Sequence, residues 1–367
     1  MGGGGARATC QADHVRTRFR VRLLDPKLRV EALGNCESSA RHDRVRPDSM
    51  SVTRRQLILL FLAVVWTAPA LSQGRRGAAA SEQRGGAQGG RRGDASRGRG
   101  ELNVPEGVKS YIDLQYANGH GRQRLDLYIP EKAKGPLPLI IWVHGGGWAL
   151  GNKGNPPPPL PLTAKGFALA SIDYRLSQHG IFPAQIEDCK AAVRWLRANA
   201  SKYNVDPEHF AAWGSSAGGH LVAMLGTAGD AKEFDVGKNL EQSSRVQAVV
   251  DWFGPTDFLK MGGDHNQPDS FESQLIGGPI QENKDKAKRA NPIAYISSNT
   301  PPFLIMHGTR DTTVPINQSE LLAEALKKAG TEVKFVRVSG ARHGDPAFTE
   351  AGNMKTVEQF LRGHLAP

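Results

Sequence analysis

A series of short apolar runs, separated by helix-like stretches, limits most strongly what this chain can fold into. The run at residues 137–143, LPLIIWV, is almost continuously apolar, as expected of a strand buried on both faces. Other strands are expected at residues 110–115, 124–129, 167–174, 210–213, 246–253, 302–306 and 333–338. Helices are expected at residues 183–203, 217–225, 318–329 and 347–361. This alternation predicts an α/β domain with a mostly parallel central sheet and helices on both faces.

The charge of the chain is unevenly distributed along its 367 residues. Residues 1–100 carry 19 Lys and Arg against 8 Asp and Glu, whereas residues 101–367 carry 28 of each sign. The net charge of +11 therefore lies entirely in the first hundred residues. Because the remainder is neutral, no specific nucleic-acid partner is expected. Cys189 is the one cysteine of residues 103–367, so that part of the sequence can form no internal disulfide.

A signal peptide is expected at residues 50–72. A pair of arginines precedes an uninterrupted apolar run at residues 57–66, which is too short to span a bilayer, and small residues suited to cleavage follow it. We expect translation to start at Met50, which makes residues 1–49 a non-native or disordered extension. The predicted location is secreted or periplasmic, with only transient membrane contact through the signal segment. An uncleaved signal anchor is the alternative.

Residues 73–102 are predicted to be a disordered Gly- and Arg-rich linker. They contain almost no large apolar side chain, so they cannot bury enough surface to offset the entropy of ordering. RGG-like repeats and an Arg-Gly-Asp tripeptide permit RNA-binding or adhesion interpretations, but biased composition explains both. The α/β domain is accordingly expected at residues 103–367.

The sequence GSSAG, centred on Ser216, matches the G-x-S-x-G pattern of an exposed serine nucleophile. It follows the predicted strand at residues 210–213 and opens the predicted helix at residues 217–225. A tight turn between a strand and a helix pushes the serine hydroxyl into the open. The helix N-terminus there favours a developing negative charge. We therefore expect Ser216 to be the nucleophile.

The sequence HGGGW at residues 144–148 directly follows the predicted strand at residues 137–143. Glycines let backbone N–H groups point into a cavity without a Cβ in the way. We expect Gly145, Gly146 and Ala217 to form an oxyanion hole. The rival interpretation, a phosphate-binding loop, lacks the required G-x-x-x-x-G-K-[ST] spacing.

A serine nucleophile needs a base, and the base needs a carboxylate that orients it. Asp311 follows the predicted strand at residues 302–306, and His343 follows the one at residues 333–338. Both lie at carboxyl ends of strands, where Ser216 also lies and where such sheets carry their chemistry. Ser216, Asp311 and His343 are therefore the candidate catalytic residues. The histidines show no metal-ligand spacing, so neither a metal nor another cofactor is expected.

Together, the segments HGGGW, SIDYRL, WFGPTD, HGTRDTTVP and ARHG resemble the esterase/lipase branch of the α/β-hydrolase superfamily. The resemblance covers residues 105–364. Within this branch, the sequence is similar to both the hormone-sensitive-lipase-like and the feruloyl/acetyl esterase groups. It implies the α/β-hydrolase fold and assigns Ser216, Asp311 and His343 to the triad. Ser215 stands where the hormone-sensitive-lipase group commonly has an acidic residue, which favours the feruloyl/acetyl group.

The resemblance implies a serine-dependent hydrolase of carboxylic esters. Its expected substrates are short acetyl or feruloyl-type esters, either small molecules or linked to a polysaccharide. The alternatives are a prolyl-oligopeptidase-like peptidase and a non-catalytic binding module on the same fold. Residues 258–296 are rich in polar side chains, and the longest helix expected among them, at residues 281–290, is mostly charged. This pattern predicts a small polar cap rather than a lipase lid. Trp148 and Trp252 are candidates for the substrate pocket. The oligomeric state stays open.

Overall fold

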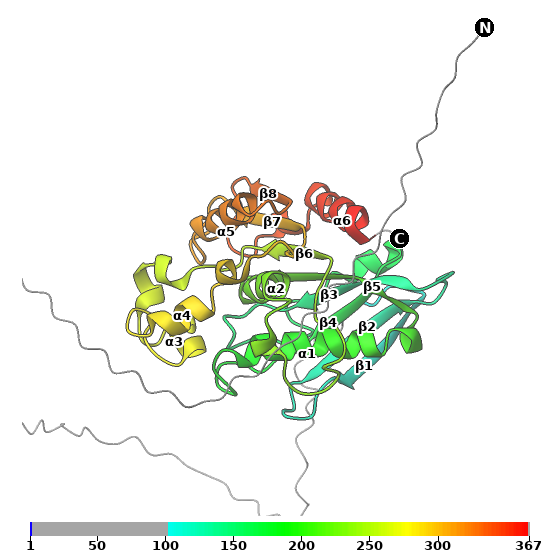
Figure 1. The fold of residues 1–367 in the computed structure, drawn as a ribbon, viewed down its shortest axis with the longest axis horizontal. Coiled ribbons are helices and arrows are strands. Elements are labelled where there is room, and N and C mark those ends of the chain that lie inside the picture. The colour runs from blue at the N-terminus through cyan, green and yellow to red at the C-terminus, as the bar shows by residue number, and fades with distance from the viewer. Residues whose placement is uncertain (2–101, 366–367) are drawn as a thin grey trace, which may run out of the picture. The chain divides into compact units, whose positions relative to one another are not determined.

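The computed structural model describes Met1 and residues 102–365 (Figure 1). The extension, signal peptide and linker predicted for residues 1–49, 50–72 and 73–102 lie outside the described residues, except for Met1 and Leu102. Eight strands form one sheet: β1 Val108–Gln115, β2 Arg124–Pro130, β3 Leu137–Val143, β4 Ala168–Ile172, β5 Val205–Ser215, β6 Ala248–Trp252, β7 Phe303–Gly308 and β8 Val333–Val338.

The strands are ordered β1-β2-β4-β3-β5-β6-β7-β8 across the sheet. β1 pairs antiparallel with β2, and β2 pairs antiparallel with β4, whereas every pair from β4 to β8 is parallel. The central strands are buried along nearly their whole length, which is why they read as continuous apolar runs. The predicted α/β-hydrolase fold, with its mostly parallel sheet, is confirmed.

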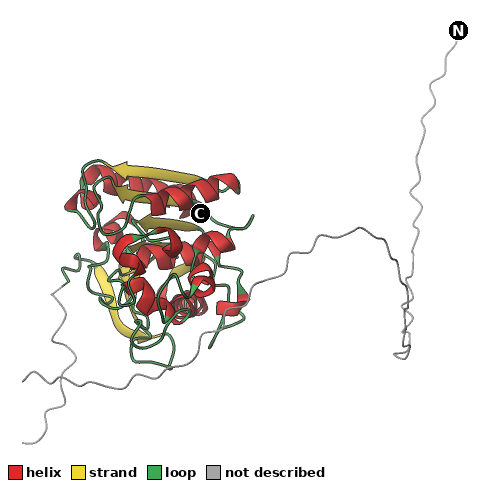
Figure 2. Ribbon diagram, turned by 90° about the vertical axis from the view of Figure 1, so that its left-hand side faces the viewer, coloured by secondary structure: helices red, strands yellow, loops and turns green. Residues whose placement is uncertain are grey.

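Helices cover both faces of this sheet (Figure 2). The helices are α1 Ala184–Ala198, α2 Ala217–Thr227, α3 Phe271–Ile276, α4 Lys284–Arg289, α5 Asn317–Lys328 and α6 Ala351–Leu365. Apolar side chains of α1, α2 and α5 belong to the larger core cluster on one face, and those of α6 belong to the cluster on the other. Cys189 is buried in the larger cluster, on α1.

The cap lies between β6 and β7. It contains α3, α4 and three short 3₁₀ turns at Phe258–Lys260, Gly263–Asn266 and Pro292–Tyr295. Phe271 of α3 lines one cavity together with Ser216, so the cap reaches over the carboxyl ends of the strands. The helix expected at residues 281–290 is found as α4, but α3 was not expected from the sequence.

One predicted helix begins later than expected. The stretch predicted as a helix over residues 347–361 is split into a 3₁₀ turn at Pro346–Thr349 and helix α6, which starts at Ala351. The Asp345 side chain accepts a hydrogen bond from the Ala347 N–H and so caps the short turn. Glu350 then adopts an extended conformation, which separates the turn from α6. The other predicted strands and helices differ from the observed ones only at their ends.

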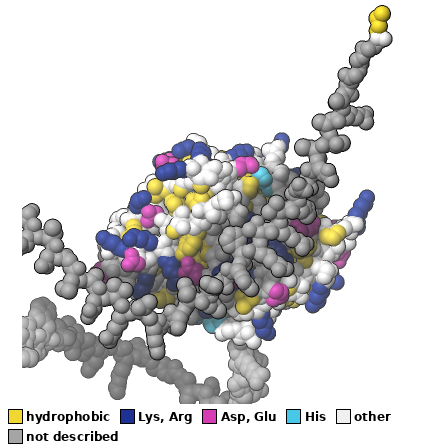
Figure 3. All heavy atoms as spheres, viewed as in Figure 1, with side chains coloured by type: hydrophobic (Ala, Val, Ile, Leu, Met, Phe, Trp, Pro, Cys, Tyr) yellow, Lys and Arg dark blue, Asp and Glu magenta, His cyan; other side chains and the backbone are white. Residues whose placement is uncertain are grey.

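Charged side chains of both signs are mixed on the face of the domain drawn in Figure 3, in keeping with its neutral net charge. Within the described part of the chain, no helix is long and apolar enough to cross a membrane.

Candidate active site

Ser216 occupies a strained turn between β5 and α2. Its backbone angles, φ of 55° and ψ of −122°, lie outside the regions that residues other than glycine ordinarily adopt. The Ser216 N–H donates to the Trp252 carbonyl at 2.9 Å, which ties the turn to β6. Ser216 itself is partly exposed, although the residues around it on β5 and α2 are buried. The turn thus presents the hydroxyl to a cavity, as expected of a nucleophile elbow.

The structure brings the three candidate catalytic side chains together. Ser216 Oγ lies 2.9 Å from His343 Nε2, and His343 Nδ1 lies 2.7 Å from Asp311 Oδ2. Because a carboxylate only accepts hydrogen bonds, Nδ1 of His343 carries the proton and Nε2 can accept from the serine hydroxyl. This arrangement suits removal of the Ser216 proton by His343.

Asp311 is held as a carboxylate by its surroundings. Its side chain is fully buried, and Oδ1 accepts hydrogen bonds from the N–H groups of Thr313 and Val314. Burial by itself would raise the pKa of Asp311, but hydrogen bonds from His307 and His343 outweigh it and hold that pKa well below its ordinary value. Asp345, two residues after His343, is engaged elsewhere as the cap of a 3₁₀ turn.

The candidate oxyanion hole lies beside the nucleophile. Within the described residues, the N–H groups of Gly145, Gly146 and Ala217 donate to no protein acceptor that the structure identifies. Gly146 has a φ of 107°, and a Cβ on it would lie 2.5 Å from the Leu150 carbonyl oxygen. A Cβ on Gly145 would meet the Ser215 carbonyl at 2.8 Å. Only glycine therefore lets this loop approach Ser216 so closely.

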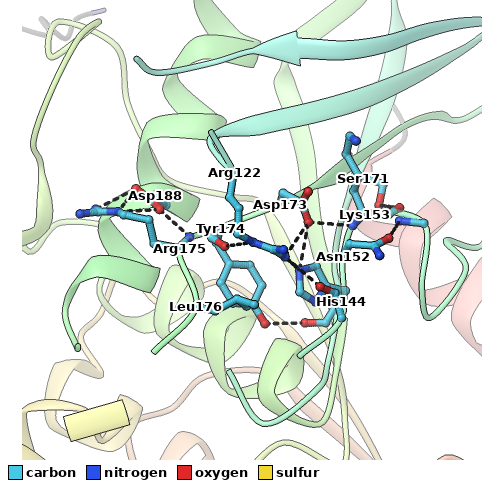
Figure 4. Close-up of polar contacts among 12 residues, drawn as sticks. Arg122, His144, Asn152, Lys153, Ser171, Asp173, Tyr174, Arg175, Leu176 and Asp188 are labelled. Atoms are coloured by element: carbon cyan, nitrogen blue, oxygen red, sulfur yellow. Dashed lines mark hydrogen bonds and ion pairs between the residues drawn. The ribbon is translucent and has the colours of Figure 1, made fainter. Parts of the chain in front are cut away.

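A polar network braces that loop from behind (Figure 4). The Tyr174 hydroxyl donates to the His144 carbonyl at 2.9 Å, and the two rings stack with centroids 4.4 Å apart. Nε2 of His144 lies 3.3 Å from Asp173 Oδ1. Arg122 donates to the same carboxylate oxygen at 3.0 Å and to the Gly151 carbonyl at 2.8 Å. The network holds His144, just before the glycine run, and Gly151, in the loop that follows it.

A cavity of about 550 Å³ opens in front of Ser216 and His343. Trp148 lines it but is buried, packed edge-on against His220 and Phe258. It therefore forms part of the cavity wall. No cluster of His, Cys, Asp and Glu that could hold a metal ion is found in the described residues.

The prediction that Trp252 lines this pocket is wrong. Its side chain points to the face of the sheet covered by α6, where it packs against Trp213 with ring centroids 4.8 Å apart. There it lines a separate cavity of about 680 Å³, together with Trp142 and Trp213. Side chains alternate between the two faces along a strand, and Trp252 falls on the face away from the nucleophile helix.

His220 lies beneath the site, on α2. It is fully buried, and its Nε2 donates to the Ala290 carbonyl in the cap at 2.7 Å. Burial lowers the pKa of His220 to about 4, so the imidazole stays neutral at physiological pH. It joins the nucleophile helix to the cap and does not face the reacting groups.

Sequence reasoning missed five polar or aromatic cap residues that line the cavity: Asp264, His265, Ser270, Phe271 and Glu272. His265 Nδ1 and Glu272 Oε1 lie 3.1 Å apart. The polar composition of residues 258–296 indicated a polar cap, but no motif shows which of its side chains turn toward Ser216.

The BD-FAE family model matches residues 125–326, which is more than half of the chain. The chain belongs to the BD-FAE family. This match confirms the resemblance that the motifs indicated, to the serine esterases of the α/β-hydrolase superfamily.

Two solved structures and one curated relative are similar to this BD-FAE chain. A truncated carbohydrate esterase from gut microbiota has 33% identity and a TM-score of 0.68, covering 73% of this chain and 99% of that one. The butyrate-bound esterase Est2 of Thermogutta terrifontis has 28% identity and a TM-score of 0.58; the match covers 71% of this chain and 96% of Est2. Esterase LipC of Mycobacterium tuberculosis is 32% identical over 235 residues; these cover 60% of this chain but only 57% of LipC.

Proposed function

We propose that this protein is a serine-dependent hydrolase of carboxylic esters. The observation that carries the proposal is the unbroken hydrogen-bonded chain from Ser216 Oγ through His343 to Asp311, with distances of 2.9 Å and 2.7 Å. The three side chains come from loops far apart in the sequence, yet they meet: Ser216 and His343 line one cavity, and Asp311 is buried behind His343. The similar proteins are named as esterases, which supports the same reaction here.

The reaction follows from this geometry. Ser216 attacks the ester carbonyl carbon while His343 takes its proton, and Asp311 stabilises the imidazolium that forms. The C–O bond to the alcohol then breaks, and His343 returns the proton to the leaving oxygen. Water attacks the acyl-enzyme by the same route in reverse, releasing the acid and free Ser216. The N–H groups of Gly145, Gly146 and Ala217 stabilise the oxyanion at each stage, and one such donor contributes roughly 100- to 1,000-fold in rate.

The proposed substrates carry short acyl groups, of the acetyl or feruloyl type, on small molecules or polysaccharides. The cavity of about 550 Å³ lies under a cap whose cavity-lining side chains include Asp264, His265 and Glu272. A lid that opens on a lipid surface needs a wide apolar stripe instead. The bound butyrate of Est2 and the carbohydrate esterase likeness support this choice.

The chain-length dependence of the rate tests this function. We expect kcat/KM on p-nitrophenyl esters to be highest for acetate or butyrate and to fall steadily toward palmitate. The rate on a long-chain ester should also show no jump when the ester exceeds its solubility limit. A maximum at palmitate together with such a jump would contradict the short-acyl preference, and no hydrolysis of any ester would contradict the proposed reaction itself.

A further inference from the structure

The residue that directly follows β6, Phe253, packs its ring against the imidazole of His343. The two ring centroids lie 4.7 Å apart, with an angle of 63° between the ring planes. Aromatic rings favour such an edge-to-face arrangement. Within the described part of the chain, Phe253 is the one aromatic ring that the structure packs against this imidazole. Its side chain is buried and lines the cavity that contains Ser216.

The backbone holds Phe253 in a conformation that bulky residues rarely adopt. Its φ is 43°, in the left-handed region that favours glycine. Its N–H donates to the Met306 carbonyl at 2.8 Å, which ties this residue to β7. Strain of this kind persists only where the surroundings enforce it, and it is concentrated at functional sites. The strained conformation places the Phe253 ring at the cavity, beside His343.

Other aromatic rings support Phe253 from the side away from His343. Phe348 lies edge-on to Phe253 with centroids 4.6 Å apart, and Trp252 contacts Phe348 at 5.5 Å. Phe348 is buried and belongs to the 3₁₀ turn Pro346–Thr349, shortly after His343 in the sequence. These contacts connect the end of β6 to the loop that carries His343.

Hydrogen bonds alone do not fix the imidazole of His343 throughout the proposed reaction. Its Nδ1 bonds to Asp311 Oδ2, and its Nε2 faces Ser216 Oγ. In the acyl-enzyme, Ser216 Oγ is esterified and has no proton to donate, so only the bond to Asp311 is left. One hydrogen bond allows a ring to swing about it. A second ring packed against the imidazole restricts that motion.

We propose that Phe253 is a positioning residue, whose ring holds the imidazole of His343 in the orientation that proton transfer requires. The inference rests on the proposed function and adds one residue to it. Proton transfer needs the donor and acceptor at hydrogen-bond distance, and a displacement of about 1 Å can lower a rate about 100-fold. Because Phe253 acts through His343, loss of its ring should lower kcat without raising KM.

The experiment removes the ring of Phe253 while keeping a large apolar side chain. Phe253→Leu and Phe253→Met lack the ring, whereas Phe253→Tyr retains it. The matched control is Phe360→Leu. Phe360 belongs to the same core cluster as Phe253, and it packs on His364 with centroids 4.7 Å apart and an angle of 62°. The full-length proteins are assayed on p-nitrophenyl acetate for kcat and KM, and their unfolding temperatures show which variants fold.

We expect Phe253→Leu and Phe253→Met to lower kcat by about 10- to 100-fold, with KM unchanged or reduced. Phe253→Tyr should keep kcat within about threefold of the wild type, because the ring contact is retained. Phe360→Leu should lower the unfolding temperature as Phe253→Leu does, yet keep the wild-type kcat. A merely structural role for Phe253 would make these two leucine variants alike in kcat.

The inference is overturned if a folded variant without the ring keeps kcat within about twofold of the wild type, or if it raises KM alone. It is also overturned if Phe253→Tyr loses as much kcat as Phe253→Leu, or if neither ringless variant folds, because the ring then serves the fold. In all of these cases the proposed function stands, since the wild type still hydrolyses the ester. A wild type that hydrolyses no ester overturns the proposed function and the inference with it.

Discussion

The hydrogen bond between Asp311 and His343 decides which imidazole nitrogen carries the proton. Asp311 Oδ2 accepts from Nδ1 of His343 at 2.7 Å, so Nε2 faces Ser216 without a proton. Because hydrogen bonds from His307 and His343 keep the pKa of Asp311 low against the effect of burial, its carboxylate stays charged at neutral pH. This single contact leaves Nε2 able to accept the Ser216 proton, which the proposed reaction requires.

Asp311→Asn is expected to lower kcat by about 10⁴-fold, because an amide stabilises the wrong imidazole tautomer. The assay is hydrolysis of p-nitrophenyl acetate by the purified variant. Asp345→Asn is the matched control. Asp345 lies two residues after His343, but its carboxylate caps a 3₁₀ turn and does not contact the imidazole. Near-normal kcat in Asp311→Asn, or a comparable loss in Asp345→Asn, would show that the triad carboxylate is assigned wrongly.

The sequence was most informative where a side chain follows the end of a strand. Ser216, Asp311 and His343 could be predicted to meet because parallel strands end at the same edge of the sheet. The prediction that Trp252 lines the substrate pocket was wrong because Trp252 belongs to β6 itself. Within a strand, the face to which a side chain points depends on the register of the strand. The partners in the His265–Glu272 pair lie in an irregular cap, and no periodic pattern fixes where their side chains point.

Among the elements, the helices of the cap were the least predictable. Helix α3 spans only six residues, Phe271–Ile276, too short to show a periodic apolar pattern. Its signals were local: Ser270 caps its start, and Gly277 ends it with a φ of 76°. Similarly, the capping side chain of Asp345 marks the turn that delays α6. These capping residues could have indicated helix α3 and the later start of α6 from the sequence.

Helix α1 is anchored to the loop after α2 by a buried cluster of charges. Lys190 and Arg194 of α1 lie 3.1 Å and 2.8 Å from Asp235 Oδ1, and both cations are almost fully buried. Burial lowers the pKa of Lys190, and the charge of Asp235 partly offsets this effect. The cluster lies outside the catalytic cavity, so its contribution is to stability.

Asp235→Ala is expected to lower the free energy of unfolding by about 3–5 kcal/mol, because it removes the carboxylate that two buried cations share. Urea unfolding followed by circular dichroism measures the change. In the control Asp230→Ala, a half-exposed pair with Arg245 is removed, and the expected loss is under about 1 kcal/mol. Equal losses in the two variants would contradict the buried role of Asp235.

For the whole molecule, the proposed function rests on residues 102–365. Every candidate catalytic residue and every described strand lies there, whereas the net charge of +11 comes from residues 1–100. We propose that residues 50–72 direct export and that translation starts at Met50. The first hundred residues then contribute nothing to the reaction.

A chain beginning at residue 101 is therefore expected to fold and to keep the kcat and KM of the full-length protein on p-nitrophenyl acetate. Thermal unfolding of both chains checks that the fold is retained. A truncated chain that is unfolded, or that folds but is inactive on this soluble ester, would show that the first hundred residues belong to the working enzyme.

The rate of ester hydrolysis by Ser216→Ala tests the central claim most directly. Replacing one partly exposed hydroxyl removes no core packing, so the variant should unfold at the same temperature as the wild type. Its kcat on p-nitrophenyl acetate should fall below about a thousandth of the wild-type value, because loss of a triad nucleophile typically costs far more than that. A folded Ser216→Ala that retains a larger share of the wild-type kcat would contradict the claim that Ser216 is the nucleophile.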